Sequence, residues 1–413
     1  MKSTKLTLLS LILVIFSGYS QNSSTLIPLK NIKLSPSGIE QPISGIENIV
    51  DGRRDSDADI FHTLWNGIPK QEIIIEADLD GKGKQLDKVV LSPRGTGING
   101  IIKTAEVWVM KKGIYQKIAY VEAEPSNSPV QVELDEPIKN PEKIKLVITD
   151  AFTDRRAGDL YMVSLGELEC MMMPKGAITR ARLLDEAQVF ADLTGTALKP
   201  DIKRREISRL KIPAIRNLAM QLYKKKYNPG LRLASYEPYL NPEVLGEKMR
   251  IGDGFSKYEG ITGVILEKGE NIVFVGETNG AKIRLVVPEW TRKAPEGVKP
   301  ESDPAGWGLK NESHVLHEGV NLIHLEKGGH AYIQYFTESD PDNYEPVNVH
   351  FPTGKINGYF DLTRGDTNAD FNALLENAVS PIMDLRGKYI QVAFPVDSLK
   401  RFTWSKGVEL IQN

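Results

Sequence analysis

The chain has 413 residues, a length typical of two or three domains, and 41% of its residues are apolar while 26% are charged. These proportions are those of ordinary globular proteins, and they exclude a disordered chain, a collagen-like repeat and a coiled-coil rod. Lys and Arg number 52 against 54 Asp and Glu, so the net charge is −2. Because there is no basic excess, we expect neither nucleic acid nor an anionic membrane as a partner.

Residues 1–20 have the pattern of a secretory signal peptide, with Lys2 and Lys5 before the apolar run Leu6–Phe16 and small residues after it. A buried core helix is the alternative. The run is shorter than the roughly 20 residues of a transmembrane helix, and no later segment is long and apolar enough. We therefore expect export, to a secreted, periplasmic or cell-surface location, with no transmembrane segment. Cys170, the only cysteine, is expected to be a buried thiol.

Residues 30–170 have the pattern of β-strands almost throughout. Short runs rich in Val, Ile, Trp and Tyr are separated by Gly, Pro, Asn and Asp. Apolar and polar residues alternate with the period of half-buried strands, and the regular spacing of the runs favours a β-sandwich. The predicted strands are Glu72–Ile75, Leu86–Leu91, Ala105–Met110, Ile114–Tyr120, Val130–Leu134 and Lys143–Ile148.

Residues 175–245 are predicted to form a helical linker. Thr179 can cap a first helix, whose apolar positions over Leu183–Ala191 share one face and which Gly195 ends. Pro213 suits the first turn of a second helix. The lysines Lys224–Lys226 follow at its carboxyl end, where the helix dipole favours cations, and they are interpreted as a solvated helix end rather than a nucleic-acid patch.

Strand patterns return over residues 246–413, which indicates a second β-sandwich. A further helix is predicted over Thr367–Ser380, and Lys293–Gly308, dense in Pro and Gly, is predicted to be a loop. The predicted fold is therefore mainly β, with two jelly-roll-like β-sandwich domains joined by a short helical segment. The strands of the second domain are Val264–Glu267, Asn271–Val275, Lys282–Val287, Asn321–Leu325, Ala331–Phe336 and Val347–Phe351.

Four histidines gather in the second half of the chain. A zinc peptidase needs HExxH on a helix, but the residue four after His317 is Asn321, so the motif is absent, and no other catalytic fingerprint is present. The pattern predicts a hairpin with a turn at Glu318–Gly319. No catalytic residue and no zinc site are assigned, and a zinc site assembled across the hairpin is the alternative. The histidines are His314, His317, His324 and His330.

Four short motifs occur in order in the first domain: IENIVDG (46–52), FHTLW (61–65), LSPRGTGINGII (91–102) and SLGELE (164–169). In this order and spacing they resemble the coagulation factor V/VIII type C, or discoidin, family. The resemblance implies an eight-stranded jelly roll whose end loops bind glycans or, in some members, lipid or protein.

In sugar-binding members of that family, a histidine, an aromatic residue, an arginine and an asparagine form a galactose-type site. The resemblance implies this role for His62, Trp65, Arg94 and Asn99, and Phe152 is a candidate second apolar wall. An aromatic face can stack on a sugar ring while the polar groups bind its hydroxyls. The alternative is structural: a core tryptophan, an ion-paired arginine and a hydrogen-bonded histidine.

The loop DGRRDSDADI is long and acidic, and Ca²⁺ prefers six to eight oxygen ligands. Family members often hold a structural Ca²⁺ between this loop and a glutamate near the end of the domain. The resemblance thus implies Asp51, Asp55, Asp57 and Glu167 as ligands of a structural calcium. The spacing is not that of an EF-hand, and a solvated acidic loop is the alternative.

From about Asn241 onward the chain is similar to the N-terminal part of enhancin-like, mucin-degrading zinc metallopeptidases, most specifically in GKINGYFDL (354–362). We expect a secreted protein that binds mucin-type glycoprotein glycans and corresponds to the non-catalytic front half of such an enzyme, since HExxH is absent and the chain stops at Asn413. Part of an active zinc peptidase, with its catalytic subdomain absent or separately encoded, is one alternative. A structural or protein-binding role at the cell surface is another.

Overall fold

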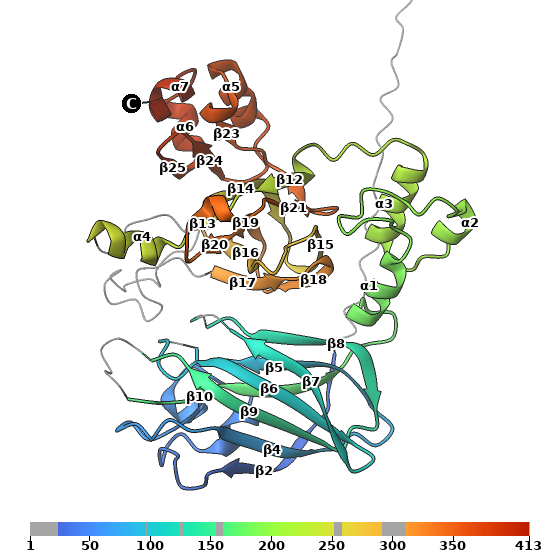
Figure 1. Ribbon diagram of the computed structural model, residues 1–413, viewed down its shortest axis with the longest axis vertical. Coiled ribbons are helices and arrows are strands. Elements are labelled where there is room, and N and C mark those ends of the chain that lie inside the picture. Colours follow the sequence, from blue (N-terminus) through green and yellow to red (C-terminus); the bar gives the residue numbers. More distant parts are fainter. Residues whose placement is uncertain are drawn as a thin grey trace, which may run out of the picture.

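The computed structural model describes residues 24–95, 97–123, 125, 127–153, 160–251, 258–290 and 311–412. Figure 1 shows that this part of the chain forms two β-rich regions with helices between them, which confirms the predicted fold class. The predicted signal peptide and the predicted loop Lys293–Gly308 lie outside the described residues. None of the helices in the described ranges is long and apolar enough to cross a membrane.

The first region is a sandwich of two sheets. One sheet has the strand order β2-β4-β9-β6-β7 and the other β1-β11-β5-β8, all antiparallel. All six predicted strands are present. The elements are β1 (Thr25–Leu26), β2 (Leu29–Ser35), the 3-10 turns η1 (Ile46–Val50) and η2 (Asp57–Asp59), β3 (Phe61–His62), β4 (Ile73–Leu79), β5 (Gln85–Ser92), β6 (Ile102–Lys111), β7 (Ile114–Glu122), β8 (Val130–Lys139), β9 (Lys143–Ala151), β10 (Ser164–Leu165) and β11 (Glu167–Met172).

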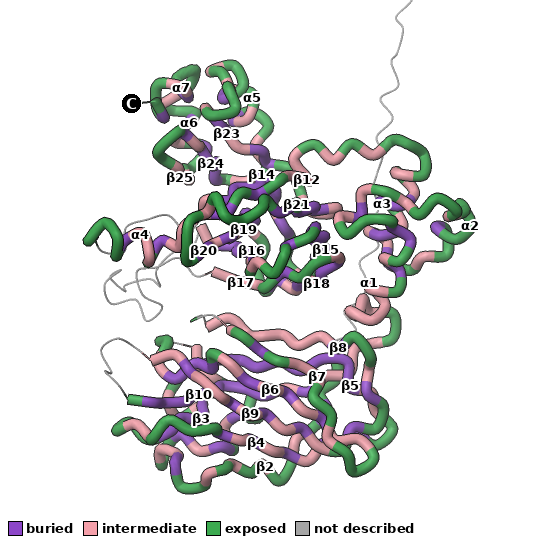
Figure 2. The backbone as a smooth tube through the Cα atoms, in the orientation of Figure 1, coloured by how far each residue is buried: buried purple, intermediate pink, exposed green. Residues whose placement is uncertain are grey.

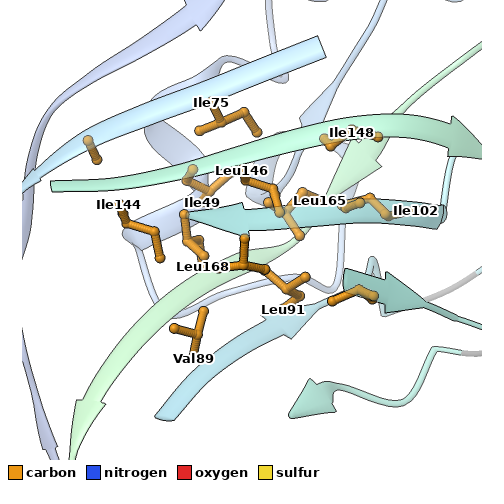
Figure 3. Close-up of a cluster of buried hydrophobic side chains, with 14 of the residues drawn as sticks. Ile49, Ile75, Val89, Leu91, Ile102, Ile144, Leu146, Ile148, Leu165 and Leu168 are labelled. Atoms are coloured by element: carbon orange, nitrogen blue, oxygen red, sulfur yellow. The ribbon is translucent and has the colours of Figure 1, made fainter. Parts of the chain in front are cut away.

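Alternation of side chains builds the core of this sandwich. On β9, Ile144, Leu146 and Ile148 are buried while the residues between them are partly exposed (Figure 2). Figure 3 shows these residues facing Leu168 and Leu91 of the opposite sheet. Such burial contributes roughly 1.5–3 kcal/mol for each large aliphatic side chain. Cys170 is fully buried in the same core, as predicted.

Helices α1 (Arg180–Ala187), α2 (Arg204–Ile207), α3 (Pro213–Tyr223) and α4 (Pro242–Met249) follow. Thr179 caps α1 as predicted, its hydroxyl accepting the Arg182 N–H at 3.3 Å. The helix ends at Ala187, earlier than predicted. Phe190, beyond its end, packs its ring edge-on against Phe274 of the second region at 5.3 Å between centroids. The Glu186 carboxylate joins α1 to α3 by accepting the N–H groups of residues 211 and 212 at 2.7 and 2.8 Å.

The second region is also a sandwich, with sheet orders β12-β21-β15-β18 and β17-β16-β19-β14-β22. The predicted histidine-bearing hairpin is wrong, because β17 pairs with β16 in one sheet and β18 pairs with β15 in the other, so the turn at Glu318–Gly319 leads from one sheet to the other. His314 and His324 lie on these two strands and not on a helix, as predicted. The strands are β12 (Leu233–Tyr236), β13 (Tyr239–Leu240), β14 (Gly260–Leu266), β15 (Gly269–Val275), β16 (Ile283–Pro288), β17 (Asn311–Leu316), β18 (Gly319–Leu325), β19 (Gly329–Gln334), β20 (Phe336–Thr337), β21 (Val347–His350) and β22 (Lys355–Ile356); η4 (Gly230–Arg232) and η6 (Pro341–Asn343) are 3-10 turns.

The chain then forms a smaller unit with its own apolar core, centred on Phe360, Phe371 and Leu385. The predicted helix is confirmed as α5, which starts one residue after the cap Thr367 and ends at Glu376 rather than at Ser380. The other elements here were not predicted. They are β23 (Phe360–Asp361), η7 (Leu362–Arg364), α5 (Asn368–Glu376), β24 (Ile382–Arg386), β25 (Gln391–Pro395), α6 (Val396–Phe402) and α7 (Gly407–Gln412).

The two sandwiches contact each other at a few polar points. Lys282 pairs with Glu122, and the Ser128 hydroxyl donates to the Asn311 carbonyl at 3.0 Å. A cavity of about 900 Å³ lies between β7 and β8 on one side and β17 and β18 on the other.

Candidate functional site

The residues of the predicted sugar site come from loops at one end of the first sandwich. Strand β3 lies beside β10 (Figure 2), and in this pairing His62 is opposite Ser164. The Ser164 N–H donates to the Gly100 carbonyl at 2.7 Å, and the Gly100 N–H donates to the Phe152 carbonyl at 2.7 Å. Four segments far apart in the sequence therefore meet at this end of the sandwich.

The His62 imidazole and the Trp65 indole form a ring pair, with centroids 4.0 Å apart and planes tilted by 36°. His62 is fully buried, and its Nδ1 donates to the Thr63 carbonyl at 2.6 Å, while its Nε2 has no hydrogen-bond partner among the described residues. Burial lowers the pKa of His62, so the ring is neutral near pH 7. Trp65 is 38% exposed, so it covers the histidine and presents its own ring to solvent.

Arg94 connects two of the loops. Its guanidinium donates to the Asp57 carboxylate at 3.0 Å and to the Asn99 carbonyl at 3.3 Å. The Arg94 side chain is 14% exposed and that of Asp57 45%, so this pair borders solvent. Ser44 connects this pair to the ring pair, because its hydroxyl donates to the Asp57 backbone carbonyl at 2.6 Å and its own carbonyl accepts the His62 N–H at 3.1 Å.

Asn99 and Phe152 complete the group. The Asn99 amide donates to the Met162 sulfur at 2.9 Å, and its carbonyl also accepts from the Ser164 hydroxyl at 3.2 Å. Phe152 is half-buried, with the Lys103 ammonium 5.9 Å from its ring centroid. The structure thus brings all five predicted sugar-site residues to one end of the sandwich, as two polar side chains and three rings.

The four predicted calcium ligands divide into two places. Asp51 and Glu167 both accept the Arg53 N–H, at 2.8 and 2.9 Å. Burial, together with the contact with Asp51, raises the pKa of Glu167 to about 7. Asp57 pairs instead with Arg94, and Asp55 is exposed.

The adjacent carboxylates of Asp51 and Glu167 suit a cation, because a positive charge would stabilise the ionised form of Glu167, whose pKa is raised. Among the described residues, no group of three or more His, Cys, Asp or Glu side chains is placed to hold a metal ion. The Asp51–Glu167 pair is therefore the part of the predicted set that the structure assembles, and the calcium site stays a prediction.

The histidines of the second half do not form one cluster. His314, His317 and His324 line the cavity between the sandwiches, and burial lowers the pKa of His314 to about 4. His330 lies elsewhere, with its Nδ1 3.1 Å from the Asp384 carboxylate. His350, which the sequence did not single out, donates from its Nδ1 to the Thr194 carbonyl and accepts the Tyr227 hydroxyl at its Nε2.

Two contributors to the first site were missed. Asp57 is predicted as a calcium ligand, whereas the structure pairs it with Arg94. Nothing in the sequence near Met162 indicates its contact with Asn99, because the two residues meet only in the folded chain. Ser164 lies within the SLGELE motif, but the motif does not predict the hydrogen bond from its hydroxyl to the Asn99 carbonyl.

No protein-family model matches the chain, and no curated protein matches it. Among solved structures it is similar to a metallopeptidase from Bacteroides thetaiotaomicron, with 25% identity and a TM-score of 0.47 over 56% of this chain and 38% of the other. It is also similar to a Clostridium perfringens ZmpB structure that contains two carbohydrate-binding modules and a catalytic domain, with 14% identity and a TM-score of 0.42 over 94% of this chain and 41% of the other.

A third similar structure is a family 32 carbohydrate-binding module of Clostridium perfringens NanJ in complex with galactose, with 23% identity and a TM-score of 0.30. The match covers 36% of this chain and 99% of the module. The chain therefore spans less than half the length of the metallopeptidase structures and nearly the whole length of the carbohydrate-binding module. These are distant structural matches of the two kinds that the sequence resembles.

Proposed function

We propose that the chain binds glycans through the loop end of the first sandwich, at His62, Trp65, Arg94, Asn99 and Phe152. The observation that carries the proposal is the half-exposed Trp65 ring, which lies on His62 next to the solvent-bordering Arg94–Asp57 pair. An aromatic face beside donors and acceptors of fixed direction is the arrangement that a sugar ring needs.

Each group has a distinct part in the proposed contact. The apolar face of a pyranose stacks on Trp65, and the sugar hydroxyls exchange hydrogen bonds with Arg94 and Asp57. His62 is too deeply buried to reach the sugar directly, so it supports the tryptophan ring from beneath. A site built from end loops is shallow, and we expect micromolar to millimolar affinity for a single sugar, roughly −4 to −8 kcal/mol.

We extend the proposal to the target and the compartment. The leader pattern of residues 1–20 supports an exported protein, and the resemblance of both halves of the sequence supports mucin-type glycoproteins as ligands. The chain would act there as an adhesive module without a peptidase mechanism of its own.

A structural calcium ion is part of the same proposal. The touching carboxylates of Asp51 and Glu167 would hold it, and the ion would fix the loop that carries Asp57 toward Arg94. Since a ligand that binds only the folded state stabilises it, Ca²⁺ should raise the unfolding temperature, and Glu167→Gln should remove that rise. An unfolding temperature that does not respond to saturating Ca²⁺ contradicts this part of the proposal.

The deciding experiment is binding of the chain to a mucin-type glycan array, followed by titration calorimetry. Galactose, GalNAc-β-1,3-galactose and the Tn antigen, which are bound in three similar solved structures, are the first probes. Trp65→Ala should weaken binding by about 10- to 100-fold, since truncating an aromatic anchor of a binding site costs roughly 1–3 kcal/mol.

Trp108→Ala is the matched control. This tryptophan lies on β6, on the outer face of the same sandwich, where Lys145 packs on its ring at 5.0 Å. The control should keep full binding. Glycan binding that survives Trp65→Ala, or that Trp108→Ala weakens equally, contradicts the assigned site.

A further inference from the structure

The second sandwich contains a serine, a histidine and an aspartate in a hydrogen-bonded row. The His330 Nε2 lies 2.7 Å from the Ser380 Oγ, and its Nδ1 lies 3.1 Å from the Asp384 Oδ2. His330 belongs to β19 and Asp384 to β24, and Ser380 precedes β24 by two residues. The three residues therefore meet where the sandwich joins the small C-terminal unit.

The hydrogen bonds around this row fix its protons. The Tyr332 hydroxyl donates to the Asp384 Oδ1 at 2.5 Å and itself accepts from the Trp290 indole at 3.0 Å. Because both carboxylate oxygens of Asp384 accept, His330 carries its proton on Nδ1. Its Nε2 is then a lone-pair acceptor that receives the Ser380 hydroxyl proton, which is the arrangement of a nucleophile, a base and a residue that orients the base.

Ser380 is accessible from one side. It lines a cavity of about 740 Å³ together with His330, Trp290, Lys268, Lys327 and Ile382. His330 and Asp384 have side-chain exposures of 5% and 2%, so the base is shielded from water while the serine borders the open space. A buried base beside a partly exposed hydroxyl can activate that hydroxyl toward a molecule in the cavity.

We propose that Ser380, His330 and Asp384 form a second, catalytic site that hydrolyses short-chain carboxylic esters. The Ser380 Oγ attacks the ester carbonyl carbon as its proton passes to the His330 Nε2, and the bond to the alcohol oxygen breaks as that proton is delivered to the leaving alcohol. Water, deprotonated by His330, then attacks the acyl-serine, which releases the carboxylic acid and restores the serine. Ser380 and His330 are the catalytic residues, and Asp384 is a positioning residue.

The surroundings favour esters over amides. The N–H groups of Val379 and Ser380 both donate to the Asn357 Oδ1, at 2.9 and 3.0 Å, and Pro381 has no N–H, so these amides do not form an oxyanion hole. Lys268 is among the residues that line the cavity, and we assign its side chain to the developing negative charge. With this weaker stabilisation, an ester with a good leaving group fits the site.

The test is labelling of the full chain with a fluorophosphonate probe, mapped by peptide mass spectrometry, and hydrolysis of p-nitrophenyl acetate on the same sample. We expect label on Ser380, and a hydrolysis rate that falls at least about tenfold in Ser380→Ala and in His330→Gln. Ser235→Ala, a change at an exposed serine on β12, is the matched control and should leave the rate unchanged.

Asp384→Asn tests the positioning role. It should lower the hydrolysis rate and also shift the pH at which the rate begins to fall, because the variant amide does not stabilise the protonated His330 ring. If Ser380 carries no label in the folded chain, or if Ser380→Ala keeps the full hydrolysis rate, the proposal is wrong. Ser380 is partly exposed and its change to alanine is small, so this variant keeps the test decisive even if the buried His330 variant does not fold.

Discussion

The two β-rich regions place their polar side chains in opposite ways. In the first, Arg94 and Asp57 meet at a loop end, and the Asp57 side chain is 45% exposed. In the second, His330 and Asp384 meet inside the molecule with side-chain exposures of 5% and 2%. The loop end suits reversible contact with an external ligand, whereas the buried pair joins two apolar cores. The contrast is therefore between a solvent-bordering ion pair in the first region and a buried histidine–carboxylate hydrogen bond in the second.

Replacing Asp384 by Ala gives the largest expected effect. The change leaves the His330 and Tyr332 polar groups buried without their carboxylate, and it should lower the free energy of unfolding by about 3–5 kcal/mol. Urea denaturation measures it, with the exposed Asp342→Ala as a control that should change little. A loss below about 1 kcal/mol would remove the contrast between the two regions.

The next effect concerns acid. Burial, and next the charge of His324, lowers the pKa of His314 from 6.5 to about 4, so the folded chain binds fewer protons than the unfolded chain between these values. Stability is therefore complete above pH 6.5 and is lost as the pH falls toward 4, by about 3 kcal/mol. His314→Gln should flatten this dependence in thermal unfolding measured from pH 7 to pH 4. The more exposed His317→Gln should flatten it less.

The loop end should respond in binding rather than in folding. Arg94→Lys replaces a planar fork that reaches Asp57 and the Asn99 carbonyl together by a single ammonium, and it should weaken glycan binding about tenfold, or 1.4 kcal/mol. Arg53→Lys, at an exposed pair with Asp51, is the matched control. An unfolding temperature that drops together with the affinity would mean that Arg94 is a structural residue.

The smallest effect has the opposite pH slope. Because the pKa of Glu167 rises from 4.5 to about 7 on folding, the folded chain holds an extra proton between these values, and stability falls as the pH increases through this window. The expected loss is of the order of 1 kcal/mol after screening by solvent. Glu167→Gln should abolish it in thermal unfolding between pH 4.5 and 7.5, and a wild-type curve that rises through this window would be the contrary result.

Local signals predicted local structure well. Thr367 caps α5 through a reciprocal bond with Asp370, and the alternation over Lys143–Ile148 gives β9, since both depend on residues within a few positions of each other. In the C-terminal sheet, β23 could not be predicted because it pairs in parallel with β24 across a helix, which leaves no hairpin signal. Strands β24 and β25 do pair as neighbours in an antiparallel arrangement, and the sequence analysis did not single them out.

In the candidate sites too, contacts between residues far apart in the sequence could not be predicted. The motifs predict one sugar site, and the structure places its residues at one end of the sandwich. These residues are His62, Trp65, Arg94, Asn99 and Phe152. Asp57 was assigned by its neighbours in the sequence to a calcium loop, although its closest charged partner is 37 residues away. The partners of His330 lie 50 and 54 residues further along the chain, so neither could be inferred from the spacing of the histidines.

The first sandwich begins and ends at the same edge. Strand β1 runs antiparallel to β11, with Thr25 opposite Met172, so the chain enters and leaves this domain side by side. A domain whose ends lie close together can be inserted into a surface loop of another protein without distorting that loop. The segment from Thr25 to Met172 therefore has the geometry of a domain that can be inserted into a loop of an unrelated enzyme with both of its ends joined to the host.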